Sequence, residues 1–314
     1  MTDYRSGFIA IIGRPNVGKS TLVNAMLGQK IAAVSPRPQT TRRRQLGILT
    51  RDDAQLIFVD TPGIHAPRHK LGEFLNQEAE GALDGVDVVL FLVDASDEPT
   101  EDDIRIASLL KKVSARIHLV LALNKMDLFA VRADGSFDFA QDKHPPLQTR
   151  LEAYQALVRK DAQVISISAL HSEHINDLTA LLISLLPIRP PEYEEDQITD
   201  LYEREIAADL IREAALLKLR DEVPHGIAVR VDDFKERENG MTYIAATLFV
   251  ERESQKGIVI GEGGRMMKQI GSAARKQIEE MGGHKVFLEL RVKVEKDWRN
   301  NENVLKRLGY RLKK

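Results

Sequence analysis

Residues 13–20 have the types and the spacing that phosphate binding requires. They read Gly-Arg-Pro-Asn-Val-Gly-Lys-Ser, which matches the phosphate-loop pattern G-x-x-x-x-G-K-[ST] in full. The two glycines allow a turn tight enough for backbone N–H groups to surround an anion, and Lys19 adds a positive charge near the terminal phosphates. The Ser20 hydroxyl is suited to bind Mg²⁺. The predicted nucleotide contacts in this segment are Gly13, Arg14, Pro15, Asn16, Val17, Gly18, Lys19, Ser20 and Thr21.

A second group of residues could complete a site for a nucleotide and its Mg²⁺ ion. An apolar run at 56–59 ends in Asp60-Thr61-Pro62-Gly63. Asp60 can hold Mg²⁺ through water, and Gly63 can offer its backbone N–H to a terminal phosphate. In the loop at 30–44, the hydroxyl of Thr41 could bind the metal and order the loop only when that phosphate is present. We therefore expect Ser20, Thr41 and Asp60 at the metal, and Lys19, Thr41 and Gly63 in catalysis.

A third group is suited to recognise guanine. The sequence Asn-Lys-Met-Asp at 124–127 follows another apolar run, and the Asp127 carboxylate can accept hydrogen bonds from both N1–H and the exocyclic amine of guanine. Adenine does not present these two donors in that arrangement, so the pairing discriminates strongly between the bases. Asn124 would tie neighbouring loops together, and the aliphatic stem of Lys125 would cover the base. Small residues after a later run could let a backbone N–H reach guanine O6; the predicted contacts here are Asn124, Lys125, Asp127, Ser168, Ala169 and Leu170.

Short apolar runs predict the strands that must position these motifs. The runs cover residues 8–12, 55–60, 86–94, 117–124 and 163–168, and stretches with helical spacing separate them. Because the runs are continuous rather than alternating, we expect an α/β domain whose mostly parallel sheet has helices on both faces. Sites in such sheets lie at the carboxyl ends of the strands, where every motif above falls.

Composition excludes several classes of function. The 314 residues are 43% apolar and 29% charged, which is typical of a soluble protein with about two domains. The absence of cysteine excludes disulfides, thiolate metal sites and cysteine nucleophiles. Neither a signal peptide nor an apolar run near ~18 residues is present, so we expect a cytoplasmic protein, with peripheral membrane contact left open. We also expect the protein to be a monomer.

Charge is distributed unevenly along the chain. The formal net charge is −2, but residues 251–314 contain 16 Lys and Arg against 9 Asp and Glu. This excess suggests that the C-terminal part binds an anionic partner. A solvated basic surface without a partner is the alternative.

The pattern along the chain predicts two domains. Residues 1–187 would form the nucleotide domain, in which the segment 129–147 has no sustained period and is expected to be a surface insert. The proline-rich segment 188–199 is expected to be a linker. Residues 200–314 would form the second domain, with a helix at 202–220, strands at 227–231 and 241–250, two helices around a glycine-rich turn, a strand at 286–294 and a basic tail.

The glycine-rich turn of the second domain has the features of a site for single-stranded RNA. Gly261 and Gly264 frame a G-x-x-G turn, which can bring backbone N–H groups and a helix N-terminus to a phosphate backbone, beside an apolar groove for unstacked bases. Glu262 departs from this pattern, because an acidic side chain weakens phosphate binding. A packing turn between two helices is the alternative. The expected RNA contacts are Ile258, Val259, Ile260, Gly261, Glu262, Gly263, Gly264, Arg265 and Lys268.

These motifs together resemble two known kinds of domain. The five nucleotide motifs resemble those of translation-factor-class GTPases, and the sequence Ile-Val-Ile-Gly-Glu-Gly-Gly-Arg at 258–265 resembles a type II, bacterial KH domain. A single GTPase domain followed directly by a KH domain is similar to the Era-like family of bacterial GTPases. Further stretches that carry this likeness are 38–42, 250–253 and 308–310, and the likeness covers nearly the whole chain.

The resemblance implies a function and several partners. It implies a switch that binds GTP and GDP with Mg²⁺, hydrolyses GTP slowly, binds 16S ribosomal RNA near its 3′ end and assists assembly of the small ribosomal subunit. The resemblance also suggests that Asn16 helps to bind a K⁺ ion beside the phosphates, and that the protein associates peripherally with the inner membrane. Ile64 stands where Ras-like members have the glutamine that orients the attacking water. The sequence therefore does not identify the group that activates this water.

Two other functions share part of this pattern. A phosphate-loop ATPase or kinase would contain the residue 13–20 motif but would not need Asp127. A constitutive RNA-binding protein would use the nucleotide only to stabilise its fold. The guanine motif argues against the first, and only a nucleotide-dependent change in RNA affinity separates the second from a switch.

Overall fold

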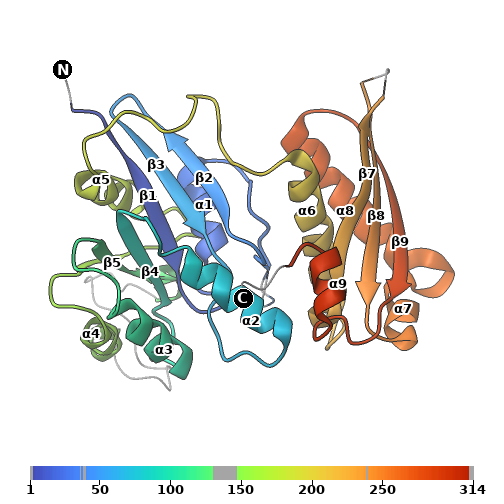
Figure 1. The fold of residues 1–314 in the computed structure, drawn as a ribbon, viewed down its shortest axis with the longest axis horizontal. Helices are drawn as coiled ribbons and strands as arrows, with labels where there is room; N and C mark the ends of the chain where they lie inside the picture. Colours follow the sequence, from blue (N-terminus) through green and yellow to red (C-terminus); the bar gives the residue numbers. More distant parts are fainter. Residues whose placement is uncertain (1–2, 36, 38–39, 130–146, 238–239, 311–314) are drawn as a thin grey trace. The chain divides into compact units, whose positions relative to one another are not determined.

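The computed structural model describes residues 3–35, 37, 40–129, 147–237 and 240–310 (Figure 1). The expected insert at 129–147 lies almost wholly outside these residues. The chain divides into two compact units. Unit 1 comprises Met1–Gln29, Arg42–Ala66 and Glu78–Asp200, and unit 2 comprises Lys30–Thr41, Pro67–Gln77 and Leu201–Lys314. Two segments from the N-terminal half of the sequence therefore belong to the compact unit of the C-terminal half.

A six-stranded sheet forms the centre of unit 1, in the order β2-β3-β1-β4-β5-β6. Its strands are β1 (Arg5–Ile12), β2 (Gln45–Thr50), β3 (Ala54–Asp60), β4 (Val88–Asp94), β5 (His118–Asn124) and β6 (Gln163–Ser166). All neighbouring pairs are parallel except β2 and β3, which are antiparallel. Every residue of β3 and β4 is buried, as expected for strands covered on both faces.

The edge strand β2 was not among the expected strands. Its six residues, Gln-Leu-Gly-Ile-Leu-Thr, include a glycine and form no long apolar run. The strand is fixed instead by pairing with β3, in which Ile48 lies opposite Ile57. Neighbouring structure thus overrides a weak local preference, as is common for strands.

Helices cover both faces of this sheet (Figure 1). Unit 1 contains α1 (Lys19–Leu27), α3 (Glu101–Leu110), the short turn η1 (Met126–Leu128), α4 (Leu147–Leu157) and α5 (Ile175–Leu185), whereas α2 (Lys70–Gly81) begins in unit 2 and ends in unit 1. The core on one face joins β1, β4 and β5 to α3 and α4 through residues such as Phe91, Ile106 and Tyr154. Helices α1 and α5 contact β3 and each other.

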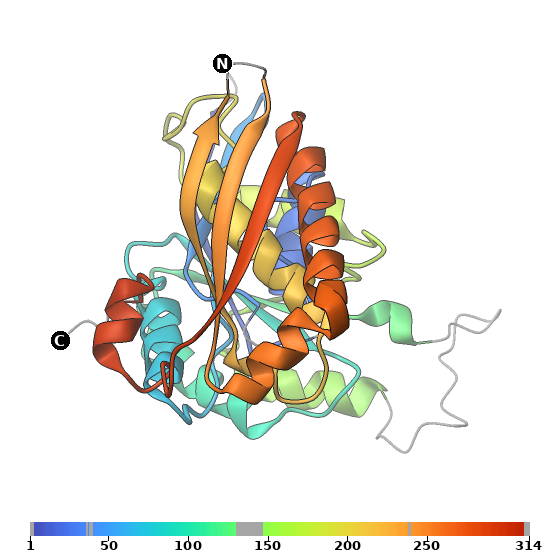
Figure 2. The ribbon, with the colours of Figure 1, turned by 90° about the vertical axis from the view of Figure 1, so that its right-hand side faces the viewer.

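Unit 2 contains a three-stranded sheet in the order β7-β8-β9 (Figure 2). Its elements are α6 (Glu203–Lys218), η2 (Pro224–Gly226), β7 (Ala228–Glu236), β8 (Thr242–Val250), α7 (Glu253–Ile260), η3 (Glu262–Gly264), α8 (Arg265–Gly282), β9 (Val286–Val294) and α9 (Glu302–Arg307). Strands β7 and β8 are antiparallel, and β8 and β9 are parallel. Up to β9, this is the order that the sequence predicts, whereas α9 lies where only a basic tail was expected.

The core of unit 2 lies on one face of its sheet. Alternate residues of β8, such as Ile244 and Leu248, point toward α6 and α8 and pack with Leu210 and Ile270. The opposite face of the sheet is not covered by these helices (Figure 2). Among the described residues, no helix is both long enough and apolar enough to cross a membrane.

Candidate functional site

The residue 13–20 segment, here called the phosphate loop, connects the end of β1 to the start of α1. Gly18 has φ 102°, a conformation that favours glycine, and a Cβ atom at this position would lie 2.4 Å from Nδ2 of Asn124. The loop therefore needs glycine both for its backbone and for the close approach of the guanine-binding segment. Helix α1 begins at Lys19, so its free N–H groups and positive end point toward the loop.

Lys19 is held inside the loop, with only 7% of its surface exposed. Its Nζ donates hydrogen bonds to the carbonyl oxygens of Gly13, at 3.0 Å, and Arg14, at 2.9 Å. Burial lowers the pKa of Lys19 to about 8, and the opposing attraction of Asp60 does not restore it. A bound phosphate would supply the missing negative charge, so the loop is arranged to receive an anion.

Ser20 and Asp60 form the part of the site that fits Mg²⁺. Strand β3 lies beside β1 with Asp60 opposite Ile11, and the Ser20 hydroxyl donates to Oδ2 of Asp60 over 2.7 Å. Mg²⁺ prefers such oxygen ligands and usually completes its coordination with substrate phosphates and water. Among the described residues, no group of three or more Asp, Glu or His side chains could hold a metal alone. The geometry thus fits a metal that binds together with a nucleotide.

The residue after Gly63 points away from the nucleotide site. Ile64 is only 2% exposed and belongs to the apolar core with Ala10 and Ile12, while its backbone N–H donates to the Gly13 carbonyl over 3.3 Å. Its side chain therefore cannot orient a water molecule. The next side chain, His65, places Nδ1 3.0 Å from the Gly63 carbonyl oxygen.

The predicted guanine residues form one connected group. Asn124 donates from Nδ2 to the Val17 carbonyl over 2.7 Å and accepts from the Ala169 N–H over 2.9 Å. It therefore joins the phosphate loop to both guanine segments. The Ser168 hydroxyl donates to Oδ1 of Asp127 over 2.5 Å, which orients this carboxylate. Leu170 is 71% exposed.

The structure gathers most of the predicted nucleotide residues in unit 1. They lie at the carboxyl ends of parallel strands, where the sequence placed them. The phosphate loop, residues 13–20, follows β1. Strand β3 ends in or is followed by Asp60, Thr61, Pro62 and Gly63, and strand β5 ends in or is followed by Asn124, Lys125 and Asp127. Strand β6 is followed by Ser168, Ala169 and Leu170. Thr41 belongs to unit 2, where the adjacent carbonyl of Thr40 accepts a hydrogen bond from Arg212.

Asp94 is a functional candidate that the sequence did not reveal. It ends β4, its side chain is 5% exposed, and its Oδ2 lies 2.5 Å from Nζ of Lys125 and 3.6 Å from a guanidinium nitrogen of Arg14. Asp103 and Asp97 also pair with Arg14, at 3.3 Å and 3.1 Å. Burial lowers the pKa of Arg14, but Asp103 and Asp94 outweigh that effect and keep the side chain charged. One carboxylate thus connects the phosphate loop to the guanine segment.

Replacing Asp94 with Asn should weaken GDP and GTP binding by about tenfold each, which corresponds to about 1.4 kcal/mol. The neutral amide would no longer hold the charged ends of Arg14 and Lys125, and titration with fluorescent GDP measures the loss. The matched variant Asp97→Asn alters a side chain that is 48% exposed and that pairs, among the residues the structure describes, with Arg14 alone, so its effect should stay below about threefold. Equal losses for the two variants would contradict a special role for Asp94.

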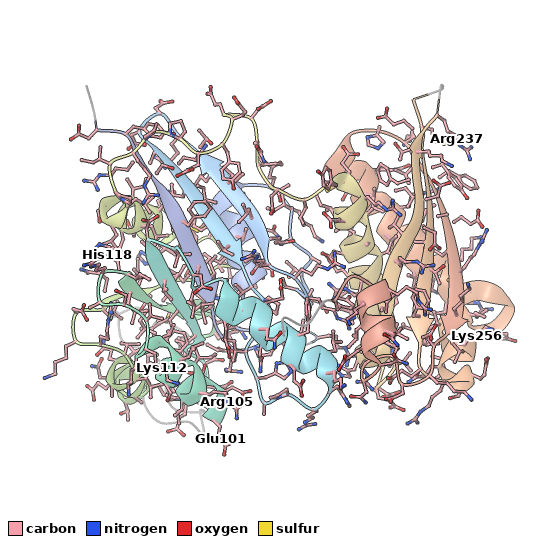
Figure 3. All side chains as sticks on the ribbon, viewed as in Figure 1. Glu101, Arg105, Lys112, His118, Arg237 and Lys256 are labelled. Carbon is pink, nitrogen blue, oxygen red and sulfur yellow. The ribbon has the colours of Figure 1, made fainter. Side chains whose placement is uncertain are left out.

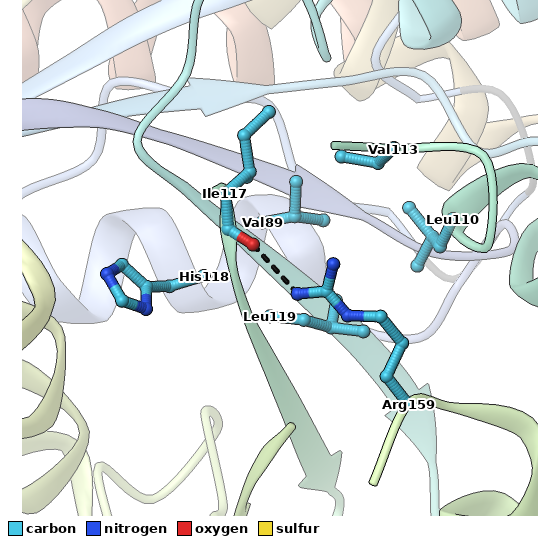
Figure 4. A pocket seen from close by; sticks show the side chains of 7 residues that line it. All are labelled: Val89, Leu110, Val113, Ile117, His118, Leu119 and Arg159. Carbon is cyan, nitrogen blue, oxygen red and sulfur yellow. Dashed lines mark hydrogen bonds between the residues drawn. The ribbon is translucent and has the colours of Figure 1, made fainter. Parts of the chain in front are cut away.

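A separate small hollow in unit 1 has no features of a ligand site (Figure 4). It is lined mainly by apolar side chains, including Leu110 and Leu119, and by Arg159, which donates to the Ile117 carbonyl over 2.8 Å. It has no room for a water molecule. The hollow is therefore part of the packing between β4, β5 and the end of α3.

In unit 2, the G-x-x-G turn joins α7 to α8. Gly261, Gly263 and Gly264 all have positive φ angles, of 72°, 58° and 78°. A Cβ atom on Gly261 would lie 2.8 Å from the backbone nitrogen of Met266, whereas one on Gly263 would meet nothing within 4 Å. The turn is therefore tightly built at its start and open to solvent at Gly263.

The predicted RNA residues divide between surface and core. Ile258, Glu262, Gly263, Arg265 and Lys268 are exposed, and Arg265 and Lys268 lie in the first turns of α8. Val259 is fully buried in the core of unit 2, so its side chain is not available to contact RNA. The exposed set combines an apolar side chain, two cations and a helix N-terminus, which suits a single RNA strand.

The site and fold define a class of protein: a phosphate-loop domain with residues for guanine, followed by a KH-type domain. Comparisons with known proteins agree. Residues 8–125 match the family described as 50S ribosome-binding GTPase, and residues 222–299 match the KH domain family. The chain is 46% identical to GTPase Era of Ruminiclostridium cellulolyticum over 312 residues, 99% of each protein.

Two solved structures have the same fold over nearly the whole chain. One is Era in complex with MgGDPNP and nucleotides 1506-1542 of 16S ribosomal RNA, at 35% identity and a TM-score of 0.86. The other is a point variant of Era from Aquifex aeolicus bound to GDP.AlF4-, at 34% identity and a TM-score of 0.86. Each comparison covers 98% of this chain and 100% of the other. This chain belongs to the GTPase Era family.

The family assignment confirms the main sequence predictions. The protein is a GTPase that binds guanine nucleotides, and its GTPase domain has a mostly parallel sheet and precedes a KH domain. The phosphate-loop ATPase or kinase is thereby excluded.

Proposed function

We propose that the protein is a GTP-dependent switch that binds 16S ribosomal RNA near its 3′ end and assists assembly of the small ribosomal subunit. The solved complex of Era with MgGDPNP and nucleotides 1506-1542 supports this function, as does the exposed G-x-x-G turn of unit 2. In this proposal Ser20, Asp60 and Thr41 hold Mg²⁺ with GTP. Asn16, which is exposed and has φ 65°, is the proposed K⁺ contact. The protein would work as a cytoplasmic monomer with peripheral contact to the inner membrane.

The observation that carries the switch is the composition of unit 2. This unit contains the RNA-binding elements and also Lys30–Thr41, which ends at the proposed Mg²⁺ ligand, and Pro67–Gln77, which follows Gly63. Both segments adjoin residues that would respond to a terminal phosphate. A change in the conformation of either segment would therefore act directly on the RNA-binding unit.

Glu213 on α6 anchors the first of these segments. Its side chain is 3% exposed, and its carboxylate accepts from Nζ of Lys30 over 2.6 Å and from the Val34 N–H over 3.1 Å. Gln277 on α8 donates to the same carboxylate over 3.3 Å. One buried charge on the RNA-binding unit thus holds the segment that carries Thr41.

An apolar cluster anchors the second segment. Leu71, Phe74 and Leu75 at the start of α2 are buried together with side chains of β7, β8 and the C-terminal residues 298–310. The ring of Phe74 meets Tyr310 edge to face, with centroids 5.4 Å apart. The Leu71 N–H also donates to the Arg299 carbonyl over 3.0 Å. Helix α2 is therefore packed against α9 and its flanking residues.

The proposed cycle follows from these two anchors. With GTP, Thr41 would bind the Mg²⁺ ion and the Gly63 N–H would bind the terminal phosphate, and the attached segments would set unit 2 in its RNA-binding state. Lys19 and the loop N–H groups stabilise the charge on the transferring phosphoryl group. Hydrolysis removes that phosphate, so both segments are released. Since Ile64 faces the core, no side chain at this position orients water, and intrinsic turnover should be slow.

A direct test compares RNA affinity in two nucleotide states. Full-length protein should bind an RNA spanning the 1506-1542 segment about tenfold more tightly with a non-hydrolysable GTP analogue than with GDP, a coupling of typical size. In Phe74→Ala this ratio should fall toward one, because the cavity weakens the contact between α2 and the C-terminal residues. Affinity for GDP itself should change less than about threefold.

Leu110→Ala provides the control for lost stability. This residue is 3% exposed and belongs to the core of unit 1 rather than to the cluster around Phe74, so its variant should keep the wild-type ratio. Equal RNA affinity of the wild type in both nucleotide states would instead favour the constitutive RNA-binding protein.

A further inference from the structure

An aromatic pair lies on the face of the unit 2 sheet opposite α6 and α8, at the end of β8 away from Phe249 and the cluster around α9. Tyr243 on β8 and Phe287 on β9 are register partners, and their rings are nearly parallel, with an interplanar angle of 20° and centroids 6.0 Å apart. Phe287 is 50% exposed, although a large apolar side chain gains from burial. The pair therefore leaves part of its aromatic surface, mainly that of Phe287, exposed to solvent.

Arg237 completes this surface. It follows the end of β7, and its guanidinium carbon lies 4.8 Å from the Tyr243 centroid and 5.6 Å from the Phe287 centroid. Figure 3 labels Arg237 at the end of the sheet where β7 leads to β8. Among the described residues, no ion pair of its guanidinium is seen, and Arg237 itself is exposed. Tyr243, Phe287 and Arg237 together are called the aromatic platform below.

The charges around the platform favour an anionic partner. On this face, Arg230, Lys235, Arg291 and Lys293 accompany Arg237, against Asp232, Asp233 and Glu289. The three acids are each paired with a neighbouring cation: Asp232 with Arg230, Asp233 with Lys235, and Glu289 with Arg291. The face therefore carries a positive excess, as does the C-terminal part of the sequence as a whole.

We propose that the aromatic platform is a second RNA contact, on which an unpaired base stacks while Arg237 attracts an adjoining phosphate. Exposed aromatic rings and guanidinium planes are the surfaces on which proteins hold single-stranded bases. Sheet strands that carry such rings are a known form of RNA site. The platform is separate from the G-x-x-G turn, which belongs to the α7–α8 connection.

A second contact also matches the size of the RNA. A G-x-x-G turn clamps about four nucleotides, whereas the segment that we propose as the target, 1506-1542 in the Era complex, is much longer. The remaining nucleotides are long enough to reach another surface on the protein. This inference thus rests on the proposed RNA-binding function and assigns part of the longer RNA to the open sheet face.

The test uses full-length protein with a non-hydrolysable GTP analogue and two RNAs. One spans the 1506-1542 segment, and the other is an unstructured RNA of about eight nucleotides, roughly twice what the turn clamps. Phe287→Leu keeps an apolar side chain but loses the ring, so it should weaken binding of the long RNA about tenfold, the size of one lost stacked base. The short RNA should bind within about twofold of wild type. Phe287→Tyr keeps the ring and should behave as wild type.

A matched pair at Gly263 separates failure of this inference from failure of the proposed function. Asp and Asn both tolerate the positive φ at this open position, and only Asp adds negative charge next to the RNA backbone. Gly263→Asp should therefore bind both RNAs about tenfold more weakly than Gly263→Asn. If the Gly263 pair differs but Phe287→Leu binds the long RNA normally, the platform is not an RNA contact. If the Gly263 pair also shows no difference, RNA binding by the KH turn is wrong as well.

Discussion

Replacing Asp127 with Asn should lower affinity for GDP and GTP by about a thousandfold. The two hydrogen bonds from guanine to a carboxylate are charge-assisted, and bonds of this kind contribute about 1.5–3 kcal/mol each. The Asn side chain keeps one acceptor oxygen but places a donor against a guanine donor. The loss of affinity therefore has two sources: one hydrogen bond to guanine is missing, and two hydrogen-bond donors face each other in the binding site. Competition between labelled GDP and unlabelled nucleotides measures it.

The same variant should gain affinity for xanthine nucleotides. Xanthine has a carbonyl oxygen where guanine has its exocyclic amine, so the Asn amide can donate to it. We expect the preference for GDP over the xanthine nucleotide to reverse in Asp127→Asn. Ser168→Ala is the matched control, since it removes the 2.5 Å hydrogen bond to Asp127 but leaves the carboxylate in place. It should weaken GDP binding by about tenfold or less and leave the preference for guanine unchanged. An Asp127→Asn protein that still prefers GDP would contradict the assignment of Asp127.

The guanine site shows why sequence alone located so much of the nucleotide machinery. Each motif follows a buried parallel strand, and the carboxyl ends of such strands meet at one edge of the sheet. Spacing and residue type then determine which contacts each side chain can make. Lys19, for example, donates to a carbonyl of the phosphate loop, and Asn124 connects two loops. Local sequence and global fold agree at these positions.

Residues whose role depends on distant partners were not predicted. Asp94 ends a strand like many others, and only the folded chain brings Arg14 and Lys125 to it. Glu213 is one acidic residue within a helix until Lys30 and Val34 reach it from far along the sequence. Strand β2 and helix α9 also depend on their neighbours, because one is a short edge strand and the other spans only six residues.

The division of the chain into units shows a further limit. A sequence pattern is read as a series of consecutive domains, but Lys30–Thr41 and Pro67–Gln77 pack with residues that follow them by more than a hundred positions. Glu213 binds the first segment and the cluster around Phe74 binds the second. Their apolar and charged residues do not indicate which unit will bury them.

Replacing Lys19 with Met should stabilise the nucleotide-free protein, and the gain should depend on pH. Burial lowers the pKa of Lys19 to about 8, compared with about 10.4 in an unfolded chain. Below pH ~8, folding therefore carries the full cost of a buried charge, of order 3 kcal/mol. Between pH ~8 and ~10.4 the unfolded state binds more protons than the folded state, so this cost declines as the pH rises.

The effect appears as a difference between two unfolding curves. The free energy of unfolding of Lys19→Met minus that of the wild type should be most positive near pH 7 and fall by about 3 kcal/mol by pH ~10.4. Lost hydrogen bonds to Gly13 and Arg14 shift this difference by a constant of about 1 kcal/mol each, and do not change its slope. Urea unfolding without nucleotide measures it. Lys112→Met, at an exposed position labelled in Figure 3, is the control and should show a flat difference.

Saturating GDP should reverse the order of stability. A phosphate beside Lys19 offsets its desolvation, so nucleotide stabilises the wild type by RT ln(1 + [GDP]/Kd), about 4 kcal/mol when GDP is a thousandfold above Kd. Lys19→Met, whose affinity should be about a hundredfold weaker for lack of this charge, gains about 1.4 kcal/mol at the same concentration. The variant would thus be the more stable protein without nucleotide and the less stable one with it. If the free energy of unfolding varied with pH in the same way for wild type and variant, burial of the Lys19 charge would not destabilise the nucleotide-free protein.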